Sequence, residues 1–164
     1  QENLIPDGYK WMRALTAGKT FKDNMELNLY YDEAAHNYSA HGYIGLYKEK
    51  SIQAIGKLKK TVLAKEVNGE MQFESESGGT VTEAEKSAIL EAVRRAEEYG
   101  YNLRTVRHRY FFVEQFYPTD FKKSSKNPIQ KSKLFNLAEM LGYKTMPDTK
   151  KIASDLDGRT WEEF

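Results

Sequence analysis

Residues 42–58, GYIGLYKEKSIQAIGKL, decide the fold that the sequence predicts. Tyr43-Ile44-Gly45-Leu46-Tyr47 and residues 51–58 are two short runs rich in aromatic, aliphatic and β-branched residues. The polar Lys48-Glu49-Lys50 lies between the two runs. Two such runs on both sides of a short polar turn are typical of two strands joined as a hairpin. These residues therefore predict the centre of a β-sheet.

Further strands are expected on both sides of this hairpin. The second strand continues to residue 66, and Asn68-Gly69 then predicts a tight turn into another strand. Residues 9–16 predict an opening strand. Residues 107–116 predict a late strand that stops at Pro118, because proline cannot donate to a strand ladder.

Helices and loops fill the remaining sequence. Thr82 and Glu85 form a capping box, and the apolar stripe that follows predicts a helix that ends at Gly100. The sequence predicts shorter helices at 134–141 and 150–156, a long loop at 21–41 with a helical turn at 32–36, and a basic loop at 122–133. This order predicts one α+β domain over residues 1–164. We expect a small curled, mostly antiparallel sheet or partial barrel with two or three flanking helices.

Composition excludes several classes of function. The 164 residues contain no cysteine, so disulfides, cysteine nucleophiles and thiolate metal sites are excluded. No run of about 18 apolar residues is present, so no membrane-spanning helix is predicted. Residues 1–8 lack the pattern of a signal peptide, and we expect a cytoplasmic protein. The net charge is only +1, but five lysines without an acid lie between residues 121 and 133.

Three segments together resemble the PUA-like superfamily, in particular its EVE, ASCH and YTH branches. They are the aromatic strand at 9–15, the strand pair at 43–47 and 52–58, and 112–116 leading to 134–137. They cover about half of the chain. The resemblance implies a small curled barrel whose pocket holds a nucleic-acid base, often a modified one, between aromatic side chains. It also implies a module of an RNA-modification, modified-DNA-sensing or defence system, with a partner protein.

The candidate site residues follow from this resemblance and from the positions of aromatic and basic side chains. Aromatic rings stack on bases and basic side chains contact phosphates. The predicted ligand-binding residues are Trp11, Arg13, Tyr30, Tyr31, Tyr43 and Arg109, and the predicted phosphate-binding residues are Lys122, Lys123 and Lys126. We expect the partner to be a nucleic acid or a nucleotide, and we expect no cofactor and no metal.

Two other functions remain open at this stage. Asp32, Glu33 and His36 would lie together on a helical turn, which is the basis for a nuclease or nucleotide hydrolase. The tyrosines would equally suit a protein-interaction surface or the core of the sheet. The family resemblance and the clustered aromatic and basic residues favour binding of a nucleic acid or nucleotide over catalysis.

Overall fold

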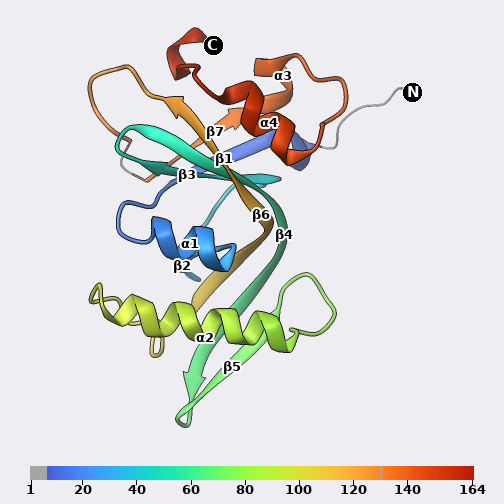
Figure 1. Cartoon of the computed structure of the whole chain (residues 1–164). Helices are drawn as coiled ribbons and strands as arrows, with labels where there is room; N and C mark the ends of the chain where they lie inside the picture. The colour runs from blue at the N-terminus through green and yellow to red at the C-terminus, as the bar shows by residue number, and fades with distance from the viewer. Residues whose placement is uncertain (1–6, 130) are drawn as a thin grey trace. The chain divides into compact units, whose positions relative to one another are not determined.

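A computed structural model describes residues 7–129 and 131–164 of the chain (Figure 1). Residues 1–6, in which we expect no signal peptide, and Gln130 lie outside the described residues. The described part has seven strands in one open, mixed and mostly antiparallel sheet, together with four α-helices. The predicted α+β class and sheet are therefore confirmed. None of the described helices has the length and hydropathy needed to cross a membrane.

The sheet has the hydrogen-bonded order β2-β6-β4-β3-β1-β7, with β5 paired to β4. The strands are β1 (Trp11–Thr16), β2 (Leu29–Glu33), β3 (Tyr43–Lys48), β4 (Ser51–Val67), β5 (Glu70–Ser75), β6 (His108–Lys122) and β7 (Ser132–Asn136). The helices are α1 (Phe21–Leu27), α2 (Glu83–Glu97), α3 (Leu137–Leu141) and α4 (Thr149–Leu156), with short 3-10 helices η1 (Asp7–Lys10) and η2 (Trp161–Glu163). The pair β1–β3 is parallel, whereas β1–β7, β2–β6, β3–β4 and β4–β5 are antiparallel.

The chain forms two compact units, and each of them is assembled from separate segments. The first unit contains residues 1–21, 39–58 and 114–164, and the second contains residues 22–38 and 59–113. The strands β4 and β6 therefore each contribute residues to both units. The single domain over residues 1–164 that the sequence predicts stays a prediction.

The core of the first unit lies between the strands β1 and β3 and the C-terminal elements. Phe121, Phe135 and Trp161 form its aromatic centre, with ring centroids of Phe135 and Trp161 4.8 Å apart. The indole N–H of Trp161 donates to the Phe121 carbonyl at 2.9 Å. This bond satisfies the polar atom of a side chain that is only 7% exposed.

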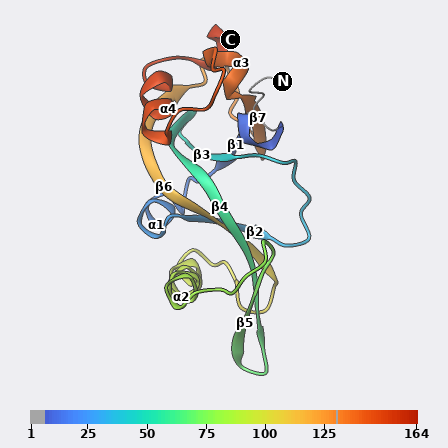
Figure 2. The ribbon, with the colours of Figure 1, turned by 90° about the vertical axis from the view of Figure 1, so that its right-hand side faces the viewer.

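The core of the second unit lies between α2 and the β4–β5 hairpin, which lie side by side in Figures 1 and 2. Ile89 and Val93 of α2 are fully buried there, as the apolar stripe predicts. Both hydrogen bonds of the predicted capping box are present between Thr82 and Glu85. The predicted turn is also present: Asn68 and Gly69 have φ angles of 54° and 83° and join β4 to β5.

The predicted long loop at 21–41 is wrong in its first half, because α1 and β2 occupy residues 21–33. The helix has buried polar residues instead of an apolar stripe. The Asn24 side-chain amide donates to the Leu29 carbonyl at 2.9 Å, and Arg95 and Tyr99 donate to the Asp23 carboxylate at 3.0 and 2.8 Å. The Arg95 and Tyr99 partners lie 72 and 76 positions away from Asp23, so the local sequence does not reveal the helix.

The late strand and the helix after it also differ from the prediction. The strand β6 continues past Pro118 to Lys122, and Pro118 is exposed. Strands accept proline where its nitrogen faces no partner. Residues 132–136, partly predicted as helix, form β7 because they pair with β1. The helix α3 begins only after Asn136, whose side chain caps the Glu139 N–H at 3.1 Å.

Candidate nucleic-acid interface

The predicted phosphate-binding lysines lie together at the end of β6 and in the loop that connects it to β7. Lys122 and Lys126 are exposed, and Lys123 is half-buried. The Lys122 ammonium lies 3.3 Å from a carboxylate oxygen of Asp120. Within residues 7–129 and 131–164, neither Lys123 nor Lys126 forms an ion pair with a carboxylate. Two ammonium groups of this loop are thus available to an anionic ligand.

The β3–β4 turn fixes the position of this loop. The Lys50 carbonyl accepts from the Lys123 N–H at 2.8 Å, and the Lys50 ammonium donates to the Lys126 carbonyl at 3.0 Å. Glu49 and Lys50 have φ angles of 54° and 60°, a region that costs an ordinary residue roughly 1–2 kcal/mol. Such strain persists where surrounding contacts hold it. Lys50 is a fourth cation beside the loop, which the sequence analysis did not identify.

Glu162 contacts the same loop from η2. Its carboxylate accepts from the backbone N–H of Ser124 at 2.8 Å, from the Ser124 hydroxyl, and from the backbone N–H of Ser125 at 3.2 Å. The Ser124 hydroxyl, followed by these backbone donors, lowers the pKa of Glu162 to about 2, so this side chain is charged at neutral pH. We call Lys50, residues 122–126 and Glu162 the lysine platform. The adjacent serines were visible in the sequence, but nothing there places residue 162 beside them.

Three predicted ligand-binding residues lie on the neighbouring strands β1 and β3 of the same unit. Trp11 is half-buried at the start of β1. Arg13 is 6% exposed and Tyr43 is 3% exposed. Burial, and then the nearby Glu114, raise the pKa of Tyr43. Of these three side chains, Trp11 is the one with substantial exposure.

A buried histidine, His41, lies close enough to Arg13 to be affected by its positive charge. His41 is 6% exposed, and its Nδ1 lies 2.9 Å from the Ser39 carbonyl. Burial lowers the pKa of His41 to about 4, the Ser39 carbonyl opposes this shift, and the positive charge of Arg13 adds to it. His41 is therefore neutral at physiological pH. The adjacent position 42 has room only for glycine, because a Cβ atom there would lie 2.8 Å from the backbone Cα of Tyr9.

The other three predicted ligand-binding residues belong to the second unit. Tyr30 and Tyr31 are consecutive residues of β2, so their side chains point to opposite faces, and both are half-buried. The Tyr31 ring packs on Tyr110 with centroids 5.9 Å apart, and burial raises its pKa. Arg109 donates to the Glu76 carboxylate at 2.8 and 3.1 Å and lies 5.2 Å from the Tyr38 ring centroid.

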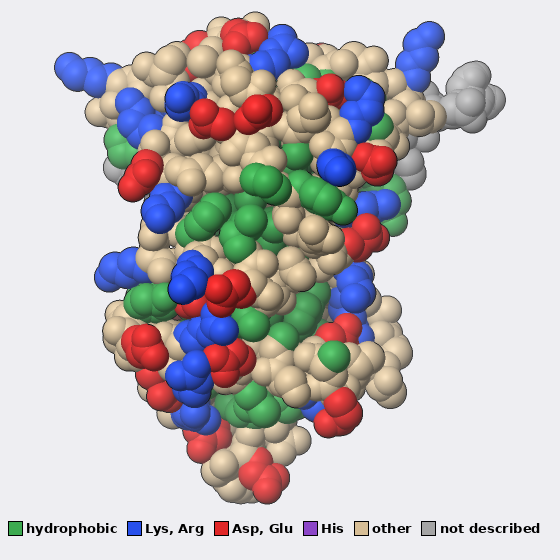
Figure 3. Space-filling model, in the orientation of Figure 1, with side chains coloured by type: hydrophobic (Ala, Val, Ile, Leu, Met, Phe, Trp, Pro, Cys, Tyr) green, Lys and Arg blue, Asp and Glu red, His purple; other side chains and the backbone are tan. Residues whose placement is uncertain are grey.

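The arginines around the start of β6 are each neutralised by a glutamate. The pairs are Arg104–Glu97 at 2.9 Å, Arg107–Glu74 at 2.6 Å and Arg109–Glu76 at 2.8 Å. The face in Figure 3 likewise shows Lys or Arg interspersed with Asp or Glu over α2. Paired guanidinium groups would have to exchange a carboxylate for a phosphate. Lys123 and Lys126 of the lysine platform have no carboxylate partner among the described residues, so they are better candidates for a phosphate contact than these arginines.

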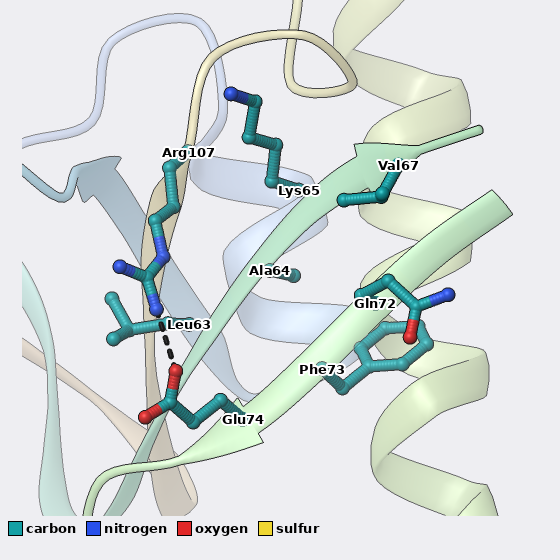
Figure 4. A pocket seen from close by; sticks show the side chains of 8 residues that line it. All are labelled: Leu63, Ala64, Lys65, Val67, Gln72, Phe73, Glu74 and Arg107. Atoms are coloured by element: carbon teal, nitrogen blue, oxygen red, sulfur yellow. Dashed lines mark hydrogen bonds and ion pairs between the residues drawn. The ribbon is translucent and has the colours of Figure 1, made fainter. Parts of the chain in front are cut away.

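A pocket of about 460 Å³ lies in the second unit, on the β4–β5 hairpin. Figure 4 shows Arg107 and Glu74 joined by their ion pair at this pocket. Its other lining side chains are Leu63, Ala64, Lys65, Val67, Gln72 and Phe73. None of the predicted site residues lines it.

The residues of the enzymatic alternative do lie close together. His36 Nδ1 is 2.8 Å from an Asp32 carboxylate oxygen, and His36 Nε2 is 3.9 Å from Glu33. The His36 side chain is 57% exposed. Among the described residues, no group of three or more acidic or histidine side chains has the geometry to hold a metal ion.

Comparisons with known proteins identify the fold. The structure is similar to that of ASCH from Zymomonas mobilis, with a TM-score of 0.50, 9% identity, and coverage of 91% of this chain and 97% of that one. It is also similar to a serine-to-alanine variant of ZmASCH from Zymomonas mobilis, with a TM-score of 0.50, 14% identity, and coverage of 83% and 94%. No protein-family model and no curated protein matches the sequence. The predicted resemblance is thus confirmed at the level of the fold, which is similar to that of these ASCH proteins.

Proposed function

We propose that this chain binds a nucleic acid or a nucleotide, with phosphates on Lys122, Lys123 and Lys126 and a base against Trp11. The observation that carries the proposal is the lysine platform, where Lys123 and Lys126 remain without a carboxylate partner in the described residues. The ASCH-like fold supports it, because the PUA-like resemblance implies base recognition. Lysines that contact phosphates hold a ligand in place without selecting its sequence.

The finer parts of the proposal concern the ligand and its setting. We propose Arg13 and Tyr43, which are buried on β1 and β3 of the unit that also contains Trp11, as further ligand-binding residues of that unit. We propose Tyr30, Tyr31 and Arg109 as ligand-binding residues of the second unit, taken by itself. The base would be a modified one. The chain would act in the cytoplasm with a partner protein, in an RNA-modification or defence system.

The test is the salt dependence of binding. Each lysine that neutralises a phosphate of a single strand contributes ~0.7 to the slope of log K against log salt. Changing Lys122, Lys123 and Lys126 together to Gln should weaken binding of all single-stranded oligonucleotides and flatten the slope by about two units. Fluorescence anisotropy at several salt concentrations measures both quantities.

A matched variant controls for net charge. Lys22, Lys59 and Lys150 are exposed lysines of α1, β4 and α4, and changing all three to Gln removes the same charge. This control should retain the wild-type slope. An equal loss of slope in both variants would mean that the lysine platform is not the phosphate contact.

A further inference from the structure

Glu162 occupies a group of donors that suits a phosphate. Two successive backbone N–H groups and a hydroxyl, from Ser124 and Ser125, converge on its two carboxylate oxygens. Converging backbone donors of this kind form anion-binding concavities in many proteins. Here the occupying anion is a side chain of the same chain, and both serines are exposed.

The surroundings give this donor group a preference for anions. Lys122 and Lys123 directly precede the serines, and Lys126 follows them. The Lys123 ammonium donates to the Ser125 hydroxyl. Lys50 holds the loop through the Lys126 carbonyl at 3.0 Å. Any ligand that reaches Lys122, Lys123 and Lys126 therefore meets Glu162 among them.

The way in which Glu162 is held allows it to leave without unfolding the core. Its neighbour Trp161 is 7% exposed and anchored through the Phe121 carbonyl, whereas Glu162 itself is exposed. A change of the Glu162 side-chain torsions would free the serine donors while Trp161 remains in place. A carboxylate carries one negative charge and two acceptor oxygens, as does the phosphodiester group of a nucleic-acid backbone.

We propose that the Ser124–Ser125 donors form a phosphodiester-binding site that Glu162 occupies in the free protein and that a nucleic-acid backbone takes over on binding. This inference rests on the proposed function, and it adds a site and a self-inhibiting contact to it. If Glu162 fills the site in nine molecules of ten, the apparent affinity for the ligand falls about tenfold, because only the open fraction binds.

The first experiment compares Glu162→Ala with Glu163→Ala by anisotropy of a single-stranded oligonucleotide. Glu163 is a neighbouring acid that contacts Arg159 and Thr160 instead of the loop, so both variants remove one negative charge. Glu162→Ala should tighten binding about tenfold, because the donors of Ser124 and Ser125 are then open in every molecule. Glu163→Ala should change binding much less. Equal changes in the two variants, or weaker binding by Glu162→Ala, would overturn the proposal.

The second experiment separates this proposal from the proposed function. Dimethyl phosphate, a minimal phosphodiester, is titrated into Glu162→Ala and wild-type protein while amide NMR signals are recorded. The Ser124 and Ser125 amides should shift saturably in the variant and much less in the wild type. Glu162→Gln, which preserves one acceptor oxygen, serves as the alternative if the alanine variant is unstable. Unshifted serine amides would refute the site, whereas shifted amides without oligonucleotide binding would refute only the nucleic-acid function.

Discussion

The ammonium group of Lys50 donates to the backbone carbonyl of Lys126 at 3.0 Å, across 76 positions of sequence. This bond joins the β3–β4 turn to the loop between β6 and β7. It explains why a lysine with a left-handed φ of 60° occupies a position that tight turns usually give to glycine. The other tight hairpin of the chain has the favourable Asn68-Gly69 pair in its turn. The comparison leads to the first of four predictions.

Replacing Glu49 with Asn should stabilise the protein. Asparagine accepts a positive φ more readily than glutamate, and the hydrogen bonds of Lys50 are unaffected. We expect the free energy of unfolding to rise by roughly 0.5–1 kcal/mol. Urea unfolding measures it through the midpoint at constant slope. Lys50→Gly relieves strain as well, but it should also weaken oligonucleotide binding; wild-type affinity in that variant would exclude Lys50 from the lysine platform.

Acid should destabilise the protein through His41. Its pKa is about 4 in the folded state and ~6.5 when unfolded, so the unfolded chain binds the extra proton first as pH falls. Neutral, buried His41 stabilises the folded state by up to about 3 kcal/mol above pH ~6.5. This contribution is lost as the pH falls from ~6.5 to ~4. His41→Gln should remove this part of the pH dependence of urea unfolding.

Tyr110→Phe should increase stability. The Tyr110 ring is fully buried in the core of the second unit, and its hydroxyl has no hydrogen-bond partner there. Burying an unpaired hydroxyl costs about 1–3 kcal/mol, whereas phenylalanine fills nearly the same space. Thermal unfolding should therefore shift upward in the variant. An unchanged or lower midpoint would indicate a buried partner for the hydroxyl, such as a water molecule.

Base stacking should change the fluorescence of Trp11. The chain has two tryptophans, and Trp161 is buried in the core, so a bound base can reach only Trp11. Stacking contributes ~1–3 kcal/mol per base and quenches indole emission. Titration with single-stranded oligonucleotides should quench the wild type but not Trp11→Phe. Quenching of equal size in both proteins would assign the signal to Trp161 and remove Trp11 from the site.

Short-range signals in the sequence were sufficient for much of the fold. Three predicted features depend on residues close in sequence, and all three are present: the hairpin at 43–58, the turn at Asn68-Gly69 and the capping box of Thr82. The helix α1 was missed because its stability depends on distant partners of Asp23, such as Arg95. The continuation of β6 past Pro118 was missed because a proline rule cannot tell which edge of a strand is paired.

The candidate site was predictable only in part. Clustered lysines are visible in any sequence, so Lys122, Lys123 and Lys126 were found together. Whether a charge is already paired depends on tertiary contacts, and for Arg109 the partner Glu76 was not foreseeable. The same holds for Glu162, whose serine donors lie 37 and 38 positions earlier in the chain.

The division of the chain into interleaved segments has a consequence for its synthesis on the ribosome. All residues of the second unit have been made once position 113 has emerged, whereas the first unit also requires residues 114–164. The aromatic centre of the first unit cannot form before Phe135 and Trp161 have been made, because they pack with residues of β1 and β3 that are made much earlier. Contacts between residues far apart in sequence form slowly. The nascent chain would therefore expose the apolar face of β1 and β3 until Phe135 and Trp161 have been made, which is the period in which a chaperone would be most useful to it.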